Sequence, residues 1–197
     1  FAAATYALTD RDYAQWFAPA GLRRGRLPSG LKAEMNPNAG EMERLYGGRV
    51  GTGGGLNAVN VLKNFSGEGL AVWGQRTLQR APTALDRVSV RRTLLYLRKA
   101  IATAVRYLTF EPNDERMWND FKGLVAPFLR SVKAGRGLRD YRVVMDETTN
   151  TDDLRSNNEA MGRILLMPMA TAEVIRVNFT LLPQGAKFEE FLTNSNA

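Results

Sequence analysis

The 197-residue chain contains neither cysteine nor histidine. The first absence excludes disulfides and thiol nucleophiles, and the second excludes imidazole as an acid, a base or a zinc ligand. No apolar run approaches the ~20 residues that a bilayer-spanning helix needs. The first thirteen residues have no basic segment followed by an apolar core, so they do not form a secretory signal. Any catalysis would depend on carboxylates or lysines, and neither occurs in a pattern with suitable spacing.

Positive charge is what the chain has in excess. Lys and Arg number 27 against 20 Asp and Glu, which gives a net charge of +7. A basic chain favours an acidic partner, which can be nucleic acid, an anionic membrane or an acidic protein. The length suits one domain, with or without extended arms. Because the sequence begins with Phe1 and not with Met, we expect one domain of a longer protein.

The first 72 residues are predicted to be irregular, because glycine, asparagine and proline interrupt any periodicity. Residues 10–17 could form a short helix or turn, and residues 56–62 and 70–73 could be strands. The glycine run GTGGG at 51–55 lacks the Lys-Ser/Thr pair of a phosphate-binding loop. A surface loop is therefore the favoured interpretation of that run.

Two helices are predicted in the middle of the chain, where apolar residues recur every three or four positions. The first covers 87–109, with Asp86 as its cap, and the second covers 114–134, with Asn113 as its cap and glycines ending it. The apolar face of the first is Val90, Leu94, Leu97, Ile101, Val105 and Leu108. That of the second is Met117, Trp118, Phe121, Leu124, Val125, Phe128 and Val132.

Strands are predicted at 141–146 and 164–167, with a short helix within 152–161. Residues 172–182 alternate in the manner of a long strand. The predicted fold class is thus α/β, of the mixed α+β kind.

Cations lie opposite both apolar helix faces. They are Lys122, Arg130, Lys133, Arg136 and Arg139 on and after the second helix, and Arg91, Arg98 and Lys99 on the first. Such stripes can simply be solvated, or they can dock an acidic partner. Nucleic-acid binders usually interleave aromatic residues with the cations, and these stripes do not. A protein partner is therefore favoured, with a basic nucleic-acid-binding domain as the alternative function.

Two further features could bind a partner or an ion. Asp146, Glu147, Asp152 and Asp153 could hold a divalent cation, but their spacing fits a hydrogen-bonded turn better. The predicted terminal strand could pair with a sheet edge of another copy, which repeated without closure gives a helical array. Its candidate residues are Val174, Ile175, Val177, Phe179, Leu181, Phe188 and Phe191.

Five segments together carry a resemblance to a known family. They are WGQRTLQ (73–79), DRVSVRRTLLYLRKAIATA (86–104), FEPND (110–114), PFLRSVKAGRGLRDYRVVMDETTNT (127–151) and NNEAMGRILLMPMATAEVIRVNFT (157–180). Together with WFAPAGLRRG (16–25) and SGEGLAVWGQ (66–75) near the start, and in this order, they resemble the inner, C-terminal domain of contractile phage tail sheath proteins. The resemblance divides the chain into an irregular N-terminal part (1–72), a sheath-type core (73–182) and a C-terminal arm (183–197).

That resemblance implies helices packed on a small mixed sheet, with extended terminal arms that exchange strands between subunits. It also implies a mechanical polymer in the virion tail, assembled in the bacterial host cytoplasm, with no catalysis and no cofactor. The sheath would surround a tail tube and contract to drive it through the host envelope. The implied partners are other copies, an acidic tail tube protein, and baseplate and tail terminator proteins, without nucleic acid or membrane insertion. The basic helix faces would meet the tube. The chain departs from the family pattern in showing no separate outer domain and no convincing N-terminal arm. We expect either that both precede Phe1 in a longer protein or that this is an unusually small sheath.

Overall fold

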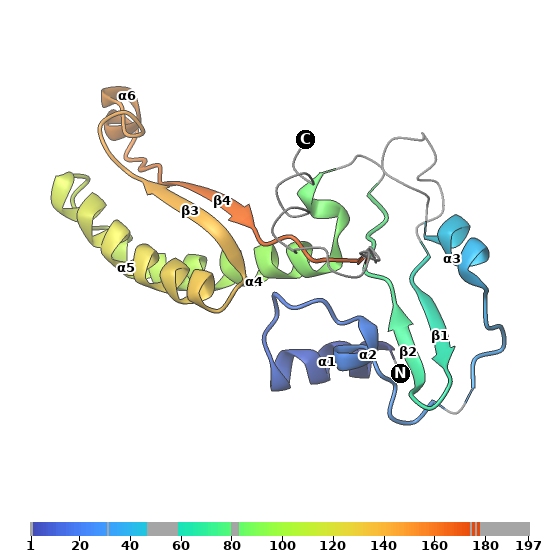
Figure 1. The fold of residues 1–197 in the computed structure, drawn as a ribbon. Coiled ribbons are helices and arrows are strands. Elements are labelled where there is room, and N and C mark those ends of the chain that lie inside the picture. The colour runs from blue at the N-terminus through green and yellow to red at the C-terminus, as the bar shows by residue number, and fades with distance from the viewer. Residues whose placement is uncertain are drawn as a thin grey trace, which may run out of the picture.

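The structure is a computed structural model that describes residues 2–30, 32–46, 59–79, 83–173, 175 and 177. Figure 1 shows two groups of elements joined through helix α4. One group contains α4, α5, α6 and the β3–β4 hairpin, and the other contains α1, α2, α3 and the β1–β2 hairpin. Each group has its own cluster of buried apolar side chains.

Helix α4 (Val88–Val105) continues into a 3₁₀ turn at Arg106–Leu108, which confirms the first predicted helix. The predicted cap is wrong. Asp86 ends a separate 3₁₀ turn (Ala84–Asp86), and the cap position is taken by Arg87, whose side chain makes no capping hydrogen bond. The carboxylate of Asp86 instead contacts two arginines. These charge contacts take the place of the capping hydrogen bond that its position before the helix suggested.

Helix α5 (Glu115–Ala134) confirms the second predicted helix, again with a different cap. The Asp114 side chain accepts a hydrogen bond from the Met117 amide at 2.9 Å, as an N-cap does. Asn113 instead accepts a hydrogen bond from the indole of Trp118 at 2.9 Å. Its amide nitrogen donates to a backbone carbonyl near the start of β4, and so this side chain links the helix to the loop before that strand.

The buried face of α5 is rotated from the predicted one. Leu129, which was not predicted to face inward, is fully buried, whereas Leu124 is 44% exposed. Val125 and Val132 are also buried, and they set the direction of the face toward α4 and β3. The main cluster of buried residues consists of Leu97, Met117, Trp118, Phe121, Val125, Leu129, Val132, Leu138 and Met145.

A tight turn connects α5 to β3, and Trp16 holds it. The Trp16 indole donates to the Gly135 carbonyl at 2.7 Å, across 119 residues of sequence. The next residue, Arg136, has a φ of 66°. A Cβ atom on Gly137 would lie 2.7 Å from Cγ1 of Val132, so this position admits only glycine without rearrangement. The N-terminal segment thereby fixes the geometry of the turn.

The hairpin β3–β4 pairs Leu138–Val144 with Arg163–Pro168 in antiparallel register. Both strands were predicted, although β3 begins three residues earlier than expected. Helix α6 (Asp152–Ser156) lies in the connection and confirms the short helix that was predicted within 152–161. β3 packs on α5, and Figure 1 shows the hairpin running alongside that helix.

The expectation of an irregular N-terminal part is wrong for much of it. It contains α1 (Ala2–Asp12), α2 (Gly21–Arg24), α3 (Ala39–Leu45), β1 (Val61–Phe65) and β2 (Gly69–Trp73). Helix α1 buries threonines and no large apolar residue, which is why hydrophobic periodicity does not reveal it. Strand β2 was predicted, but β1 starts later than residue 56. The glycine run at 51–55 lies outside the described residues.

The predicted small mixed sheet is wrong as well. The described residues form two separate two-stranded antiparallel sheets, β1–β2 and β3–β4. Each pair is adjacent in sequence, so local hairpin pairing replaces the crossover that a mixed sheet requires. Residues 172, 173, 175 and 177 are not in a strand, which corrects the prediction at these positions, while the rest of 172–182 lies outside the described residues.

Candidate assembly interface

An open apolar groove lies between α4 and β4, and we call it the α4–β4 groove. It has a volume of about 690 Å³. Its walls include Leu94, Ile101 and Val105 of α4 and Ile164 and Leu166 of β4, all of them half-buried. The predicted apolar face of α4 therefore lies partly in this groove, because the fully buried residues of α4 are Ser89, Thr93 and Leu97.

The β3–β4 hairpin has two unpaired edges among the described residues, since each of its strands pairs only with the other. On the side of β4 that points away from α5, Leu165 is 52% exposed and Met167 is 51% exposed. Met169, just after the strand, is 40% exposed. We call these three residues the outer face of β4. Unpaired edges beside exposed apolar residues are typical of strands that pair with another chain.

Phe110, at the end of the groove, is a fully exposed aromatic residue in an uncommon conformation. Its φ of 74° lies in the left-handed region, which bulky residues seldom occupy. Tyr107, one turn earlier, is also strongly exposed. Backbone strain of this kind persists where the surrounding structure imposes it, and it concentrates at functional sites. The FEPND segment thus leaves an aromatic side chain exposed at the end of the groove.

The C-terminal strand candidates are only partly described. Ile175 is 82% exposed and Val177 is 64% exposed, and neither belongs to a strand. The candidates outside the described residues are Val174, Phe179, Leu181, Phe188 and Phe191. Two branched apolar side chains standing in solvent are unfavourable in an isolated subunit, because each leaves apolar area in water.

The basic candidates lie on surfaces, in two groups. Seven are exposed and Lys122 is half-buried. The ring contact between Tyr96 and Phe128, at 6.0 Å between centroids, places the middle of α4 against the C-terminal half of α5. Among the described residues, Lys133 is the only candidate in an ion pair, at 2.7 Å from Asp140. The exposed ones without such a pair are Arg91, Arg98, Lys99, Arg130, Arg136 and Arg139.

The acidic cluster forms a turn. The Asp146 carboxylate accepts hydrogen bonds from the Thr148 amide at 2.9 Å and from the Thr148 hydroxyl. The hydroxyl bond is the main cause that lowers the pKa of Asp146 below its ordinary value. Within the described ranges, no group of three acidic residues has the arrangement of a metal site. Nor is any helix there long and apolar enough to cross a membrane.

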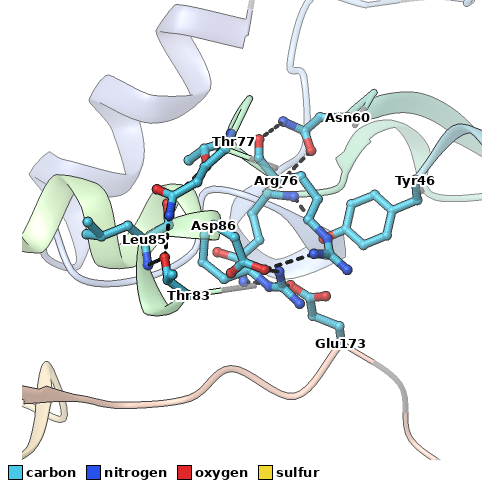
Figure 2. Close-up of polar contacts among 11 residues, drawn as sticks. Tyr46, Asn60, Arg76, Thr77, Thr83, Leu85, Asp86 and Glu173 are labelled. Carbon is cyan, nitrogen blue, oxygen red and sulfur yellow. Dashed lines mark hydrogen bonds and ion pairs between the residues drawn. The ribbon is translucent and has the colours of Figure 1, made fainter. Parts of the chain in front are cut away.

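Sequence reasoning missed a polar network at the point where the chain leaves β4 and approaches the β1–β2 hairpin (Figure 2). Asp86 contacts Arg76 at 2.9 Å and Arg87 at 2.7 Å. Arg87 in turn lies 2.6 Å from Glu173, which also accepts a hydrogen bond from Gln75 at 3.1 Å. Four of these residues lie within the segments 73–79 and 86–104 that carry the resemblance. The presence of polar and charged side chains among apolar ones in these segments was the signal that could have indicated the network.

This combination of features defines a structural domain built for association with other chains. It has open strand edges, an apolar groove beside one of them, exposed apolar side chains near the C-terminal end and unpaired surface cations. Residues 80–180 match the phage tail sheath C-terminal domain family, and the chain belongs to that family. It is a structural family and not a family of enzymes, as the sequence led us to expect.

Two curated relatives are tail sheath proteins. The one from Vibrio phage KVP40 is 31% identical over 186 residues, covering 94% of this chain and 26% of the relative. The one from Enterobacteria phage T4 is 30% identical over 184 residues, covering 93% of this chain and 27% of the relative. The chain therefore spans about a quarter of the length of these relatives.

Solved structures share the fold. The sheath complex of PVC, an extracellular contractile injection system, in its contracted state superposes with a TM-score of 0.80 at 27% identity. That match covers 94% of this chain and 50% of the other. A chain of the anti-feeding prophage baseplate superposes with a TM-score of 0.78 at 23% identity, covering 92% of this chain and 49% of the other.

Proposed function

We propose that the chain is the assembly domain of a contractile tail sheath subunit, located in the tail of a phage or of a related injection particle. In this function it polymerises with copies of itself around a tail tube and contracts without bond chemistry. Two kinds of evidence support the proposal. They are the family membership with its sheath relatives, and the hairpin β3–β4 with its unpaired edges beside the α4–β4 groove.

The occupant that we propose for the groove and the neighbouring β4 edge is the C-terminal segment (residues 174–197) of a second copy. Ile175 and Val177 are exposed on one copy, and the groove offers Ile101, Val105 and Ile164 on the other. A strand added at the β4 edge would place alternate side chains toward the groove, because successive residues of a strand face opposite sides. Fully extended, the residues after Glu173 would span roughly 80 Å, enough to reach a neighbour.

Such an exchange is heterologous, because the segment of one copy binds a different surface of the next. Repeated without closure, a heterologous contact generates a helical array, which is the form that a sheath requires. Movement between a long and a short array would come from interfaces with discrete packing states. If each subunit gained roughly a few kcal/mol on moving from the long to the short array, the sum over all subunits would drive contraction without any cofactor.

Negative-stain microscopy of the concentrated chain tests the proposal, with a truncation that removes residues 184–197. We expect the unmodified chain to form tubes or long polymers. We expect the truncated chain to keep the circular dichroism spectrum of a folded domain and to stay monomeric. Intact tubes from the truncated chain would refute a role for residues 184–197 in linking the copies. A strictly monomeric unmodified chain at high concentration would count against self-assembly.

For the tube, we propose that the exposed cations of α4 and of the α5 end face an acidic tail tube protein. This proposal is supported by the exposure of Arg91, Arg98 and Lys99, which form no ion pair within the described part of the chain. Exposed ion pairs contribute about 0–1 kcal/mol each, so several of them hold position yet release on contraction. Baseplate and tail terminator proteins would contact the two ends of the array.

Cosedimentation of the sheath chain with purified tail tubes tests the tube contact. Arg98→Gln with Lys99→Gln should weaken binding, and the loss should shrink as salt rises, since salt screens exposed charges. Lys32→Gln is a matched control, because Lys32 is exposed and lies outside both helices. Equal binding by the double variant and the control would contradict the proposed orientation of α4.

A further inference from the structure

The chain segment that follows β4 is held at one point by charge and almost nowhere by packing. Residues 169–172 are exposed, and Glu173 is exposed as a whole residue although its side chain is only 22% exposed. The amide of Met169 donates to the Gly137 carbonyl at 3.4 Å, close to the strand end. Beyond it, Glu173 accepts a hydrogen bond from Gln75, forms an ion pair with Arg87 and interacts with the Tyr46 side chain. The position of the segment at that point depends on one carboxylate.

The site that receives Glu173 is itself fixed by other parts of the chain. The Val88 amide donates to the Gln75 carbonyl at 2.7 Å, and Arg76 forms a β-bridge with Arg87. The Asn60 side chain exchanges two hydrogen bonds with the backbone of Arg76, at 2.7 and 2.9 Å. Figure 2 shows these groups converging from the β1 side and from the start of α4. The receiving site is thus tied together by backbone and side-chain hydrogen bonds, whereas the segment that it holds makes few contacts.

The charges in this network balance, but its hydrogen bonds do not. Two arginines, Arg76 and Arg87, face two carboxylates, Asp86 and Glu173, and all four side chains are mostly buried. Yet Oε1 of Gln75, Nε of Arg76 and Nη1 of Arg87 are buried without a hydrogen-bond partner. The Arg87–Asp86 contact at 2.7 Å is therefore a charge contact without hydrogen-bond geometry. A partly satisfied buried network is weaker than a complete one, so it can rearrange.

A cavity lies behind the same segment. It has a volume of about 730 Å³, and its walls include Thr171, Ala172 and Glu173 on one side and Tyr46 and Trp73 on the other. The segment forms part of the wall of this cavity, and Thr171 and Ala172 are exposed there. The Glu173 contacts carry the attachment.

We propose that Glu173, with Arg87 and Gln75, is a positioning latch that sets the direction in which the C-terminal segment leaves the domain, and hence which neighbouring copy it reaches. This inference rests on the proposed exchange of that segment. The latch is closed when Glu173 contacts Arg87 and Gln75, and open when these contacts are broken. In the closed state, the C-terminal segment starts from one fixed point and the array adopts one register. With the latch open, the segment remains attached at Met169 and can swing across the cavity without leaving the neighbour that it binds.

Distances between two spin labels in the dilute, monomeric full-length chain test the latch. The chain has no cysteine, so Ile175→Cys and Leu95→Cys introduce the only two labelling sites. Both positions are exposed, the first beyond the latch and the second on α4. Starting from this labelled chain, Glu173→Gln removes the charge, Arg87→Gln removes its partner, and Glu147→Gln is the matched control at an exposed carboxylate without an ion pair in the described structure.

We expect a narrow distance distribution in the labelled chain and in the Glu147→Gln control. In Glu173→Gln and Arg87→Gln the width should grow about two-fold or more, because the held state is no longer favoured. Glu173→Asp keeps the charge and should give a narrower distribution than Glu173→Gln. A broad distribution in the starting chain, or an unchanged width in both latch variants with an unchanged melting temperature, would overturn the inference.

Assembly is measured separately, so the two ideas can fail independently. Without labels, Glu173→Gln should still polymerise but give tubes several-fold shorter or of mixed diameter, because the segment still binds and no longer starts from one point. Tubes of unchanged length and diameter would contradict the positioning role. If the unmodified chain formed no polymer while the label distances changed as expected, the proposed exchange would fail and the latch would stand for the free chain.

Discussion

The burial of α5 can be tested quantitatively with two of its leucines. Periodicity predicts that Leu124 is buried and Leu129 is not, whereas the structure shows the reverse. Leu129 is fully buried among the main cluster, and Leu124 is 44% exposed. Replacing a buried leucine with alanine removes its transfer energy and leaves a cavity, with measured costs of about 2.7–5.0 kcal/mol. For Leu129→Ala we expect about 3–4 kcal/mol of lost unfolding free energy.

Leu124→Ala is the matched control, with the same atoms removed from the same helix. Its side chain already lies partly in water, so we expect a loss of at most about 1 kcal/mol. Urea denaturation followed by tryptophan fluorescence measures both, since Trp118 is buried in the same cluster as Leu129. With a slope of about 2 kcal/mol per molar urea, the midpoint should fall by roughly 1.5–2 M for Leu129→Ala and by less than about 0.5 M for Leu124→Ala.

Equal losses for the two variants, or a larger loss for Leu124→Ala, would refute the rotation of the face. Because the whole stability of a domain of this size is about 5–15 kcal/mol, Leu129→Ala should remain folded at low urea. The slopes of the two denaturation curves should agree, since a change in slope would report a different native or denatured state.

Two further substitutions test particular hydrogen bonds. Trp16→Phe removes the donor to the Gly135 carbonyl and should cost about 1–2 kcal/mol in urea denaturation; no loss would show that this bond does not stabilise the turn. Asp146→Asn should lower stability at pH 7 and match the unmodified chain in acid. The sign follows because the folded pKa of Asp146 lies below its unfolded value, so its contribution is present above the unfolded pKa and disappears as pH falls through the folded pKa. Melting temperatures across pH 2–7 measure this, and a constant difference would contradict it.

Strong periodicity made α4, α5 and the two strands of the second hairpin predictable from sequence. It failed for the exact phase of α5, because seven apolar positions leave a face broad enough to be rotated, and neighbours in the fold decide between Leu124 and Leu129. It also failed for α1, whose buried residues are Thr5 and Thr9. Small polar residues do not stand out in a hydrophobic pattern, although one of them, Thr9, bonds to the helix backbone at 2.9 Å.

The candidate interface was predictable in kind and not in detail. The sequence indicated exposed cations and a segment suited to pairing, and it suggested a polymer. It could not place the α4–β4 groove, because that groove forms where the half-buried sides of Ile101 and Ile164 meet across 63 positions of sequence. Nor could it find the contact between Arg87 and Glu173, since ion pairs between distant residues leave no local periodicity.

The outer face of β4 has a chemical consequence for the lifetime of free subunits. Met167 and Met169 hold thioethers in water, where peroxide can reach them. Oxidation turns each flexible apolar side chain into a polar sulfoxide. A subunit stored unassembled under oxidising conditions would therefore lose competence at this surface, and methionine sulfoxide reductase would restore it. Particles whose neighbours cover these sulfur atoms would age far more slowly than the pool from which they were built.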